Sequence, residues 1–293
     1  MSNPIHDFSN ALAALVAQAA PSVVRVDTRR WVGSSGIVWS AEGHIVTASH
    51  SVHGEQVEVG LPGGITAPAT LVGRDPSTDL ALLKADTNGL KVPTWAESDG
   101  LKVGQVVLAL GKPGKNVRAS LGILSNLGEE WRTPLGGKLE RYIQPDVNLY
   151  PGFSGGPLLD AEGRFLGMNT RALRRDLALT IPTPTLRRVI ERLMRHGGMR
   201  RGYLGVGVQP VRLPPSAAQE SGLLLVSVEP GSPAEAGGLM VGDILLAING
   251  NPLRHLDDLL AQLAEMPPGA SANLRIMRGG QTQDISVALD ERK

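Results

Sequence analysis

The chain has 293 residues, of which 42% are hydrophobic, so its length suits two domains with separate cores and its composition argues against disorder. Aromatic residues make up only 3% and the formal net charge is +1, which together speak against a nucleic-acid partner. With no cysteine in the chain, disulfides, zinc ribbons and thiol nucleophiles are excluded.

Residues 1–20 are predicted to form an amphipathic helix, with Ser9 as a candidate cap and Pro21 closing the segment. Its apolar residues recur at helical spacing, at Phe8, Leu12, Leu15 and Val16. The segment lacks the basic start and unbroken apolar run of a secretory signal, and no stretch is long enough to cross a membrane. We therefore expect either a cytoplasmic protein or a chain whose leader has been removed.

Short apolar segments separated by Gly, Pro, Asn or Asp follow, with almost no helical periodicity among them. This pattern is typical of all-β sandwiches and barrels. It predicts one all-β domain over residues 21–198, with strands at 22–28, 43–49, 56–61, 69–74, 80–85, 105–110, 120–126, 141–145, 156–160 and 164–170.

A helix is predicted to end this domain, because helical periodicity returns in residues 182–198. The expected buried face consists of Leu186, Val189, Ile190, Leu193 and Met194, and Gly197 and Gly198 supply the stop. The arginines of this segment lie mostly on its polar face, which indicates a solvated surface rather than a binding patch.

Residues 201–293 are predicted to form a second, small α+β domain. Strand-like segments lie at 203–211, 222–230, 243–250 and 273–289, the last a hairpin about Gly279 and Gly280. Between them, residues 253–266 have helical spacing with one apolar face, formed by Leu256, Leu259, Leu260 and Leu263.

The stretch YPGFSGGPLL at 150–159 is a turn that contains Ser154. A serine hydroxyl needs a neighbouring base, an acid that orients the base, and N–H donors for the developing oxyanion. The glycines allow the backbone N–H groups near Gly152 and Ser154 to converge beside the hydroxyl. The stretch is therefore either a tight turn that contains a serine or the presentation of a nucleophile.

Candidates for the base are His50 and His53, which follow an apolar strand, and candidates for the acid are Asp75 and Asp79. Each has a structural alternative, since a histidine can be structural and the two aspartates can cap the turn at Pro76. The order His, Asp, Ser is the order of chymotrypsin-like barrels. Without cysteine or an HExxH motif, the histidine pair predicts no metal site.

The segment GKPGK at 111–115 lacks the spacing of a phosphate-binding loop, so we expect no nucleotide and no other cofactor.

The chain resembles the HtrA/Deg serine proteases over nearly its whole length. The matching segments, in order, are PSVVRV, GSSGIVWSAEGHIVTASH, DPSTDLALLK, SLGILSNLG, YIQPDVNLYPGFSGGPLLDAEGRFLGMNT, TIP, RGYLGV and GSPAEAGGLMVGDILLAING. The resemblance implies a mainly β protein, a chymotrypsin-like double β-barrel followed by a small α+β PDZ domain. It also implies a serine endopeptidase that degrades unfolded or misfolded proteins.

By the same resemblance, His50 is the general base, Asp79 orients it, and Ser154 is the nucleophile. The turn of Gly152, Phe153 and Ser154 then forms the oxyanion hole. This assignment decides against His53 and Asp75.

Substrate preference also follows from the resemblance. Asn148, six residues before the nucleophile, occupies the base of the S1 pocket, where trypsin-like enzymes have an aspartate. Leu179 and Thr180 line a wall of that pocket. We therefore expect cleavage after Val, Ala, Ile or Leu rather than after basic residues.

In the second domain the resemblance implies a peptide-binding groove. The carboxylate-binding loop is Tyr203, Leu204, Gly205 and Val206, and the groove runs beside the helix at 256–263. Peptide C-termini bind such domains as an added strand. The alternative is a packed domain without a ligand.

The chain departs from the family pattern around its candidate site. Ala48 and Ser49 precede the candidate base and Ser51 follows it, Phe153 precedes the nucleophile, and Glu129 stands where the family usually has an arginine. Residues 128–137 still resemble the family's sensor loop, poor in apolar residues and rich in turn formers.

Other functions fit these departures. A catalytically weak or inactive scaffold could act as a peptide-binding adaptor or as a chaperone for unfolded chains. Family habit implies a homotrimer built through the N-terminal region, and a location in the periplasm or cell envelope.

Overall fold

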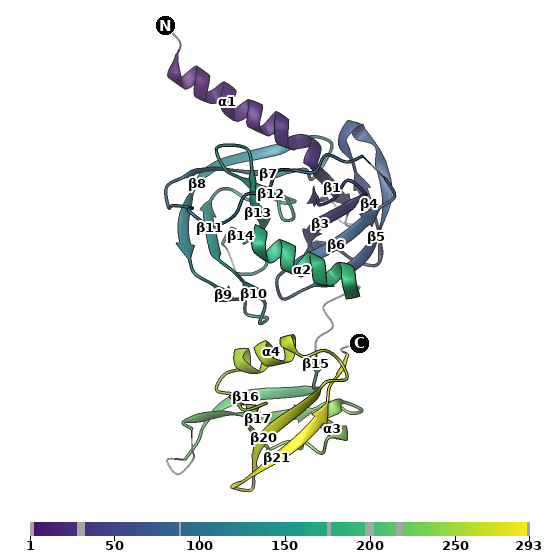
Figure 1. Ribbon diagram of the computed structural model, residues 1–293, viewed down its shortest axis with the longest axis vertical. Coiled ribbons are helices and arrows are strands. Elements are labelled where there is room, and N and C mark those ends of the chain that lie inside the picture. The colour runs from purple at the N-terminus through teal and green to yellow at the C-terminus, as the bar shows by residue number, and fades with distance from the viewer. Residues whose placement is uncertain are drawn as a thin grey trace. The chain divides into compact units, whose positions relative to one another are not determined.

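A computed structural model describes residues 3–27, 33–87, 89–174, 177–196, 202–214 and 219–291 (Figure 1). The chain divides into two compact units, with the break between residues 196 and 202. Both units are built mainly from strands, as the sequence predicts. Within the described residues, no helix is long and apolar enough to cross a membrane.

The first unit begins with a closed antiparallel barrel of order β1-β2-β3-β6-β5-β4. Its core is filled by small and branched side chains such as Val26, Ile45 and Leu83, which suits a chain with few aromatic residues. Only the second strand was absent from the sequence prediction. The strands are β1 (Val23–Asp27), β2 (Ser34–Val38), β3 (His44–Ala48), β4 (Gln56–Gly60), β5 (Thr66–Asp75) and β6 (Leu80–Ala85).

A second six-stranded antiparallel sheet has the order β11-β8-β7-β12-β13-β14. Its end strands β11 and β14 lie side by side, so this sheet nearly closes into a barrel too. A short hairpin, β9 (Trp131–Arg132) with β10 (Lys138–Leu139), extends from it. The strands of the sheet are β7 (Val106–Gly111), β8 (Arg118–Gly128), β11 (Tyr142–Asp146), β12 (Pro157–Leu159), β13 (Phe165–Thr170) and β14 (Leu179–Pro182).

The helix α2 (Thr183–His196) packs against β5 and β6 of the first barrel and β13 and β14 of the second. Four of its five predicted core residues are buried: Leu186, Val189, Ile190 and Leu193. The fifth prediction was wrong, because Met194 is 49% exposed and lies at the margin of the helix's apolar stripe. The predicted stop at Gly197 and Gly198 lies outside the described residues.

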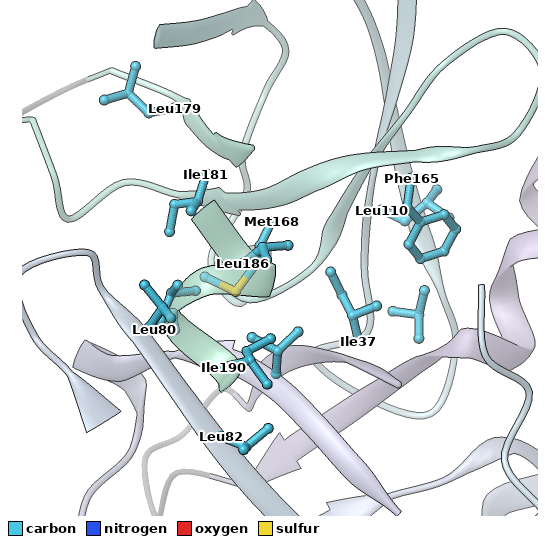
Figure 2. Packing of buried hydrophobic residues seen from close by; sticks show 14 of the residues in the cluster. Ile37, Leu80, Leu82, Leu110, Phe165, Met168, Leu179, Ile181, Leu186 and Ile190 are labelled. Atoms are coloured by element: carbon cyan, nitrogen blue, oxygen red, sulfur yellow. The ribbon is translucent and has the colours of Figure 1, made fainter. Parts of the chain in front are cut away.

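The core beneath α2 joins the two barrels (Figure 2). Leu186 and Ile190 of α2 belong to the same buried cluster as Leu80 and Leu82 of β6 and Met168 of β13. Because one cluster draws on both barrels, the first unit has a continuous core between them.

The N-terminal helix α1 (Pro4–Ala19) starts earlier than Ser9, so the predicted cap was wrong. Asn3 caps it instead, since its side chain accepts a hydrogen bond from the Ile5 N–H at 3.1 Å and proline suits the first helical position. The later apolar residues of the helix pack on the core, whereas Ile5 and Phe8 are 79% and 50% exposed. Figure 1 shows the start of α1 extending away from the barrels.

The second unit contains a five-strand path, β16-β17-β18-β20-β21, in which β16 is an edge strand. The predicted hairpin turn at Gly279 and Gly280 is present, with φ of 58° and 81°, as a tight two-residue turn requires. Its elements are β15 (Gly202–Tyr203), β16 (Val206–Arg212), β17 (Ser221–Val228), α3 (Pro233–Ala236), β18 (Ile244–Ile248), β19 (Asn251–Pro252), α4 (Leu256–Glu265), β20 (Ser271–Arg278), β21 (Gln281–Ala288) and β22 (Asp290–Glu291).

The helix α4 packs against β15 and β16. Leu259 and Leu263 are buried as expected, and Leu260 is half-buried. Leu256 is 42% exposed, so its predicted burial was wrong. It is the first residue of the helix, and helical side chains point back toward the N-terminus, which directs this one beyond the packed face.

Candidate active site

His50 and Asp79 form a hydrogen-bonded pair. His50 lies in the turn after β3, and Asp79 in the turn before β6, two strands whose ends pair at Ala48 and Leu80. The Nδ1 atom of His50 lies 2.8 Å from Oδ2 and 3.0 Å from Oδ1 of Asp79. Because Asp79 can only accept when ionised, Nδ1 carries the proton, which leaves Nε2 free to act as a base.

The backbone around Asp79 fixes this geometry. Its carbonyl accepts the Ser49 N–H at 3.0 Å, and its Oδ1 accepts the His50 N–H at 2.9 Å. The Asp79 side chain is only 4% exposed, whereas that of His50 is 43% exposed. The His50 ring is therefore accessible to solvent, and the Asp79 carboxylate that binds it is shielded.

Asp75 has a different part. It is fully buried and accepts hydrogen bonds from the Ser77 N–H at 3.0 Å, the Ser77 hydroxyl at 2.6 Å and the Thr78 hydroxyl at 2.7 Å. These bonds shape the turn that carries Asp79. His53, the other candidate base, is exposed.

Thr170, which the sequence reasoning missed, also binds Asp79. It ends β13, and its hydroxyl donates to Asp79 Oδ2 at 2.5 Å. The signal in the sequence was a polar residue at the end of a buried apolar strand, which is too common to single out. Three donors, the His50 ring and N–H and the Thr170 hydroxyl, thus converge on the Asp79 carboxylate.

Ser154 lies in a tight turn before β12 whose glycines are required by space. Gly152 and Gly155 have φ of 85° and 88°. A Cβ on Gly155 would lie 2.0 Å from the Ser35 carbonyl oxygen, and one on Gly152 would lie 2.4 Å from that of Gly33. The turn at 152–155, which contains Ser154, therefore lies directly against the start of β2.

Within the described residues, the N–H groups of Gly152 and Ser154 have no hydrogen-bond acceptor. The Phe153 N–H, by contrast, donates to the Tyr150 carbonyl at 2.9 Å. Two free N–H groups beside Ser154 are what an oxyanion hole needs, and Phe153 adds no third donor.

The Phe153 ring is fully buried. It packs over Gly111 and lies edge-on to Tyr150, with ring centroids 5.6 Å apart. The bulky residue before the nucleophile therefore fills the interior of the second barrel.

The segments that carry His50 and Ser154 are linked through one hydroxyl, that of Ser34. Ser34 Oγ lies 3.0 Å from the hydroxyl of Ser51, the residue after His50, and donates to the Ser154 carbonyl at 2.7 Å. Within the described part of the chain, neither Ser154 Oγ nor His50 Nε2 makes a hydrogen bond. Such bonds often tighten only when substrate is present.

The residues predicted to form the S1 pocket lie in different surroundings. Asn148 is exposed, and its N–H donates to the Ser120 hydroxyl at 2.9 Å. Leu179 and Thr180 are buried in β14, where Leu179 pairs with Thr170. Their place in a substrate pocket stays a prediction.

The segment GKPGK at 111–115 packs against the turn that contains Ser154. Gly111 receives the Phe153 ring, and Pro113 touches Gly152. Lys112 is 7% exposed, and its burial lowers the pKa of its amine, an effect to which nearby Arg25 adds. Packing thus accounts for a motif that the sequence left without a function.

In the loop at 128–137, Trp131 packs against the core and lies edge-on to the ring of Tyr142. Thr133 is buried, and its hydroxyl donates to the Ser77 carbonyl at 2.6 Å. This hydrogen bond joins the β9–β10 hairpin to the turn that carries Asp79.

In the second unit, the predicted carboxylate loop has free donors. The carbonyls of Leu204 and Gly205 accept hydrogen bonds from Ala234 and Glu229, each at 2.9 Å, while the N–H groups of Leu204 and Gly205 have no acceptor within the described residues. Gly205 has φ of 80°, and a Cβ there would meet Ser232. The edge strand β16 starts at Val206, the last residue of this loop.

Comparisons with known proteins agree with both units. The trypsin-like peptidase domain family matches residues 34–168, and the PDZ domain family matches residues 202–289. A probable periplasmic serine endoprotease, DegP-like, from Halomonas elongata is 34% identical over 276 residues, which are 90% of this chain and 57% of that protein. One from Pseudomonas fulva is 36% identical over 266 residues, 87% of this chain and 55% of that protein. The chain thus spans little more than half the length of these curated relatives.

Solved structures match over almost their full length. The serine endoprotease from Yersinia pestis has a TM-score of 0.75 and 31% identity, covering 95% of this chain and 97% of that one. The HtrA-type protease AlgW with a decapeptide has a TM-score of 0.74 and 30% identity, covering 96% and 98%. With its trypsin-like and PDZ domains in this order, the chain belongs to the HtrA family of serine proteases.

Proposed function

We propose that the protein is a serine endopeptidase that degrades unfolded or misfolded proteins. The observation that carries this proposal is the hydrogen-bonded His50–Asp79 pair together with a turn that presents Ser154 beside two unbonded N–H groups. The Ser34 hydroxyl links the two regions, because it contacts Ser51 and the Ser154 carbonyl. A shielded acid, an accessible base and an oxyanion site are the parts that a serine nucleophile needs.

In the proposed reaction, Ser154 Oγ attacks the peptide carbonyl carbon while His50 Nε2 takes the hydroxyl proton. The N–H groups of Gly152 and Ser154 stabilise the oxyanion, and Asp79 stabilises the imidazolium without taking its proton. The intermediate collapses when His50 gives that proton to the leaving amine. A water, deprotonated by His50, then hydrolyses the acyl-enzyme and releases Ser154.

We infer a preference for Val, Ala, Ile or Leu before the cleaved bond. Asn148 offers no negative charge to a basic side chain, and Leu179 with Thr180 would supply an uncharged wall. This assignment rests on the family resemblance, because the exposed position of Asn148 does not by itself indicate a pocket.

The second unit is proposed to bind peptide C-termini and to regulate the protease. The free N–H groups of Leu204 and Gly205 suit a carboxylate, and the adjoining edge strand β16 can accept a further strand. The solved structures of AlgW include complexes with a tripeptide and a decapeptide.

The remaining proposals concern organisation and place. We propose a helix at 1–20, a protease domain at 21–198, a PDZ domain at 201–293, and a homotrimer joined through the N-terminal region. A periplasmic or cell-envelope location is proposed because the DegP-like relatives are named periplasmic.

The test is degradation of an unfolded, cysteine-free model protein by the wild type and by Ser154→Ala, with fragment ends identified by mass spectrometry. We expect fragments from the wild type alone, ending mainly in Val, Ala, Ile or Leu. If neither protein cleaves, even with C-terminal hydrophobic peptides added, the endopeptidase proposal fails and a binding scaffold or chaperone takes its place.

A further inference from the structure

Two adjacent serines at the start of β2, Ser34 and Ser35, hold the backbone of the nucleophile turn. Their exposed fractions are only 4% and 0%. The Ser35 hydroxyl donates to the Gly152 carbonyl at 2.6 Å. The Ser154 carbonyl accepts from the Ser34 hydroxyl at 2.7 Å and from the Ser35 N–H at 3.2 Å. The carbonyls of both oxyanion-hole residues therefore face β2.

These hydrogen bonds fix whole peptide units, because a peptide plane carries one carbonyl and the next N–H. In the unit that joins Gly152 to Phe153, Ser35 holds the carbonyl and the Tyr150 carbonyl receives the N–H at 2.9 Å. In the unit after Ser154, Ser34 and Ser35 hold the carbonyl and the Asn169 carbonyl receives the Gly155 N–H at 2.9 Å.

The unit between them carries the Ser154 N–H. Its carbonyl, that of Phe153, accepts the Gly156 N–H at 2.9 Å, so only the Ser154 N–H remains unbonded within the described residues. Three successive planes are thus fixed. The direction of the Ser154 N–H is therefore set by hydrogen bonds within its own plane and in the planes on both sides of it, while the Gly152 N–H lies in the plane just before them.

The proton of the Ser35 hydroxyl can serve only the Gly152 carbonyl among these partners. The Lys112 N–H lies 2.7 Å from Ser35 Oγ and must donate to it. Since a hydroxyl has one proton, that proton is left for Gly152. The turn lies so close to β2 that a Cβ on Gly152 or Gly155 would clash with the carbonyls of Gly33 or Ser35, so the turn has no room to move closer to β2.

We propose that Ser35, assisted by Ser34, is a positioning residue for the oxyanion hole. It aims the Ser154 N–H by holding the peptide planes on both sides of it, and it restrains Gly152, which supplies the other N–H, through the Gly152 carbonyl. This inference rests on the proposed serine endopeptidase function, and it places part of the oxyanion-hole machinery on the barrel that carries the base.

The test compares steady-state cleavage of a peptide substrate by the wild type, Ser35→Ala and Ser34→Ala. We expect Ser35→Ala to lower kcat about tenfold to a hundredfold, which is somewhat less than the loss of an oxyanion-hole donor itself. KM should be unchanged, because the oxyanion exists only after attack. Ser34→Ala should lower kcat by about tenfold or less, since the Ser35 N–H still holds the Ser154 carbonyl.

A second readout separates positioning from general loss of structure. A peptide boronic acid with valine at its reactive end forms a tetrahedral adduct that places an oxygen in the oxyanion hole, whereas the same peptide as a carboxylic acid does not. The boronic acid should bind Ser35→Ala more weakly by the same factor by which kcat falls, and the carboxylic acid should bind unchanged.

Thr183→Val is the matched control. The Thr183 hydroxyl is buried and donates to the Leu166 carbonyl at 3.1 Å, away from the nucleophile turn. This variant should lose stability and keep its kcat and boronic acid affinity. If Ser35→Ala does not fold, Ser35→Cys carries the test, since a thiol of similar size donates a weaker hydrogen bond and should give an intermediate kcat.

Two failures are distinguishable. A wild-type protein that neither cleaves the peptide nor binds the boronic acid overturns the proposed function. An active wild type whose folded Ser35 variants keep their kcat within twofold, raise KM alone, or lose no more than Thr183→Val does, overturns the positioning role of Ser35.

Discussion

Asp79 adopts a left-handed backbone conformation, with φ of 57°, which is uncommon for a residue with a side chain. In this conformation its carbonyl and its carboxylate both face the turn that carries His50, one accepting from Ser49 and the other from His50. Aspartate tolerates the left-handed region better than most residues do. Local strain of this kind tends to occur where a side chain must be held for function.

Thr170→Val tests the support that Asp79 receives from β13. The change removes a hydroxyl that donates to the buried carboxylate and keeps the shape of the side chain. Since hydrogen bonds to charged groups are the stronger ones, we expect kcat to fall about tenfold. Peptide cleavage measured across pH checks this, with Thr183→Val as the control. Unchanged kcat in a folded variant would show that the His50 bonds alone hold Asp79.

At the scale of elements, α2 joins the barrels because its buried side chains contact strands of both. Periodicity alone predicts the position of this helix. It predicts the core residues before Met194 correctly, because four apolar side chains at helical spacing define a single face that must be buried. The contact with both barrels could not be predicted, since it depends on where β5, β6, β13 and β14 meet in space.

Ile190→Ala measures this contact. Ile190 is 1% exposed, so its truncation should leave a cavity and lower the free energy of unfolding by about 2–5 kcal/mol. Met194→Ala, on the same helix but 49% exposed, should change it by less than about 1 kcal/mol. Denaturant unfolding of both variants checks the prediction, and equal losses would contradict the burial described for α2.

Asp243, just before β18, accepts a two-pronged hydrogen bond from Arg278 at the end of β20, with both contacts at 2.7 Å. Burial of Asp243 raises the pKa of its carboxyl, but the Arg278 hydrogen bond, the Met240 N–H and the Arg278 charge outweigh it and lower that pKa. Because the pKa of Asp243 is lowered in the folded state, its carboxylate stabilises the fold at pH values above its unfolded-state pKa, which is about 3.9.

Asp243→Asn should therefore reduce hydrogen-exchange protection of β18 and β20 at neutral pH. The difference in protection between this variant and the wild type should shrink once the pH falls below about 4, and it should disappear as the pH passes through the lowered pKa of Asp243. Asp284→Asn, which breaks the exposed pair with Arg275, should have a smaller effect because solvent screens that pair. A difference that stays constant down to low pH would exclude the charge as the cause.

Sequence patterns do not predict the parts of the candidate site that depend on hydrogen bonds between distant segments of the chain. His50, Asp79 and Ser154 were named from the order of three local motifs and a family resemblance. Thr170, Ser34 and Ser35 were missed because serine and threonine are frequent in strands and turns, and their partners lie far away along the chain. Ser9 is a plausible cap by residue type, but Asn3 is one as well, and the position of Pro4 favours the earlier start.

For the whole molecule, the exposed start of α1 is the feature that bears on assembly. Ile5 and Phe8 remain open while the rest of the apolar face of the helix is covered by its own unit. A homotrimer that covers this end would remove both side chains from water, which favours association.

Phe8→Asp tests that proposal. It should convert a trimer into a monomer in sedimentation velocity, because a charge replaces apolar surface in the contact. Ala13→Asp adds the same charge at an exposed position off the apolar face and should leave the trimer intact. A wild-type protein that sediments as a monomer at all concentrations would overturn the proposed assembly.

His50 and Asp79, the proposed base and acid, lie in the first barrel, whereas Ser154, its turn and Thr170 lie in the second. During synthesis, a chain whose first barrel has just folded carries His50 and Asp79 but no nucleophile. Ser154 and its turn are translated later, and the carbonyls of Gly152 and Ser154 are held by β2 of the first barrel. In the proposed protease, the order of the chain would therefore leave the catalytic site incomplete until the second barrel has folded against β2.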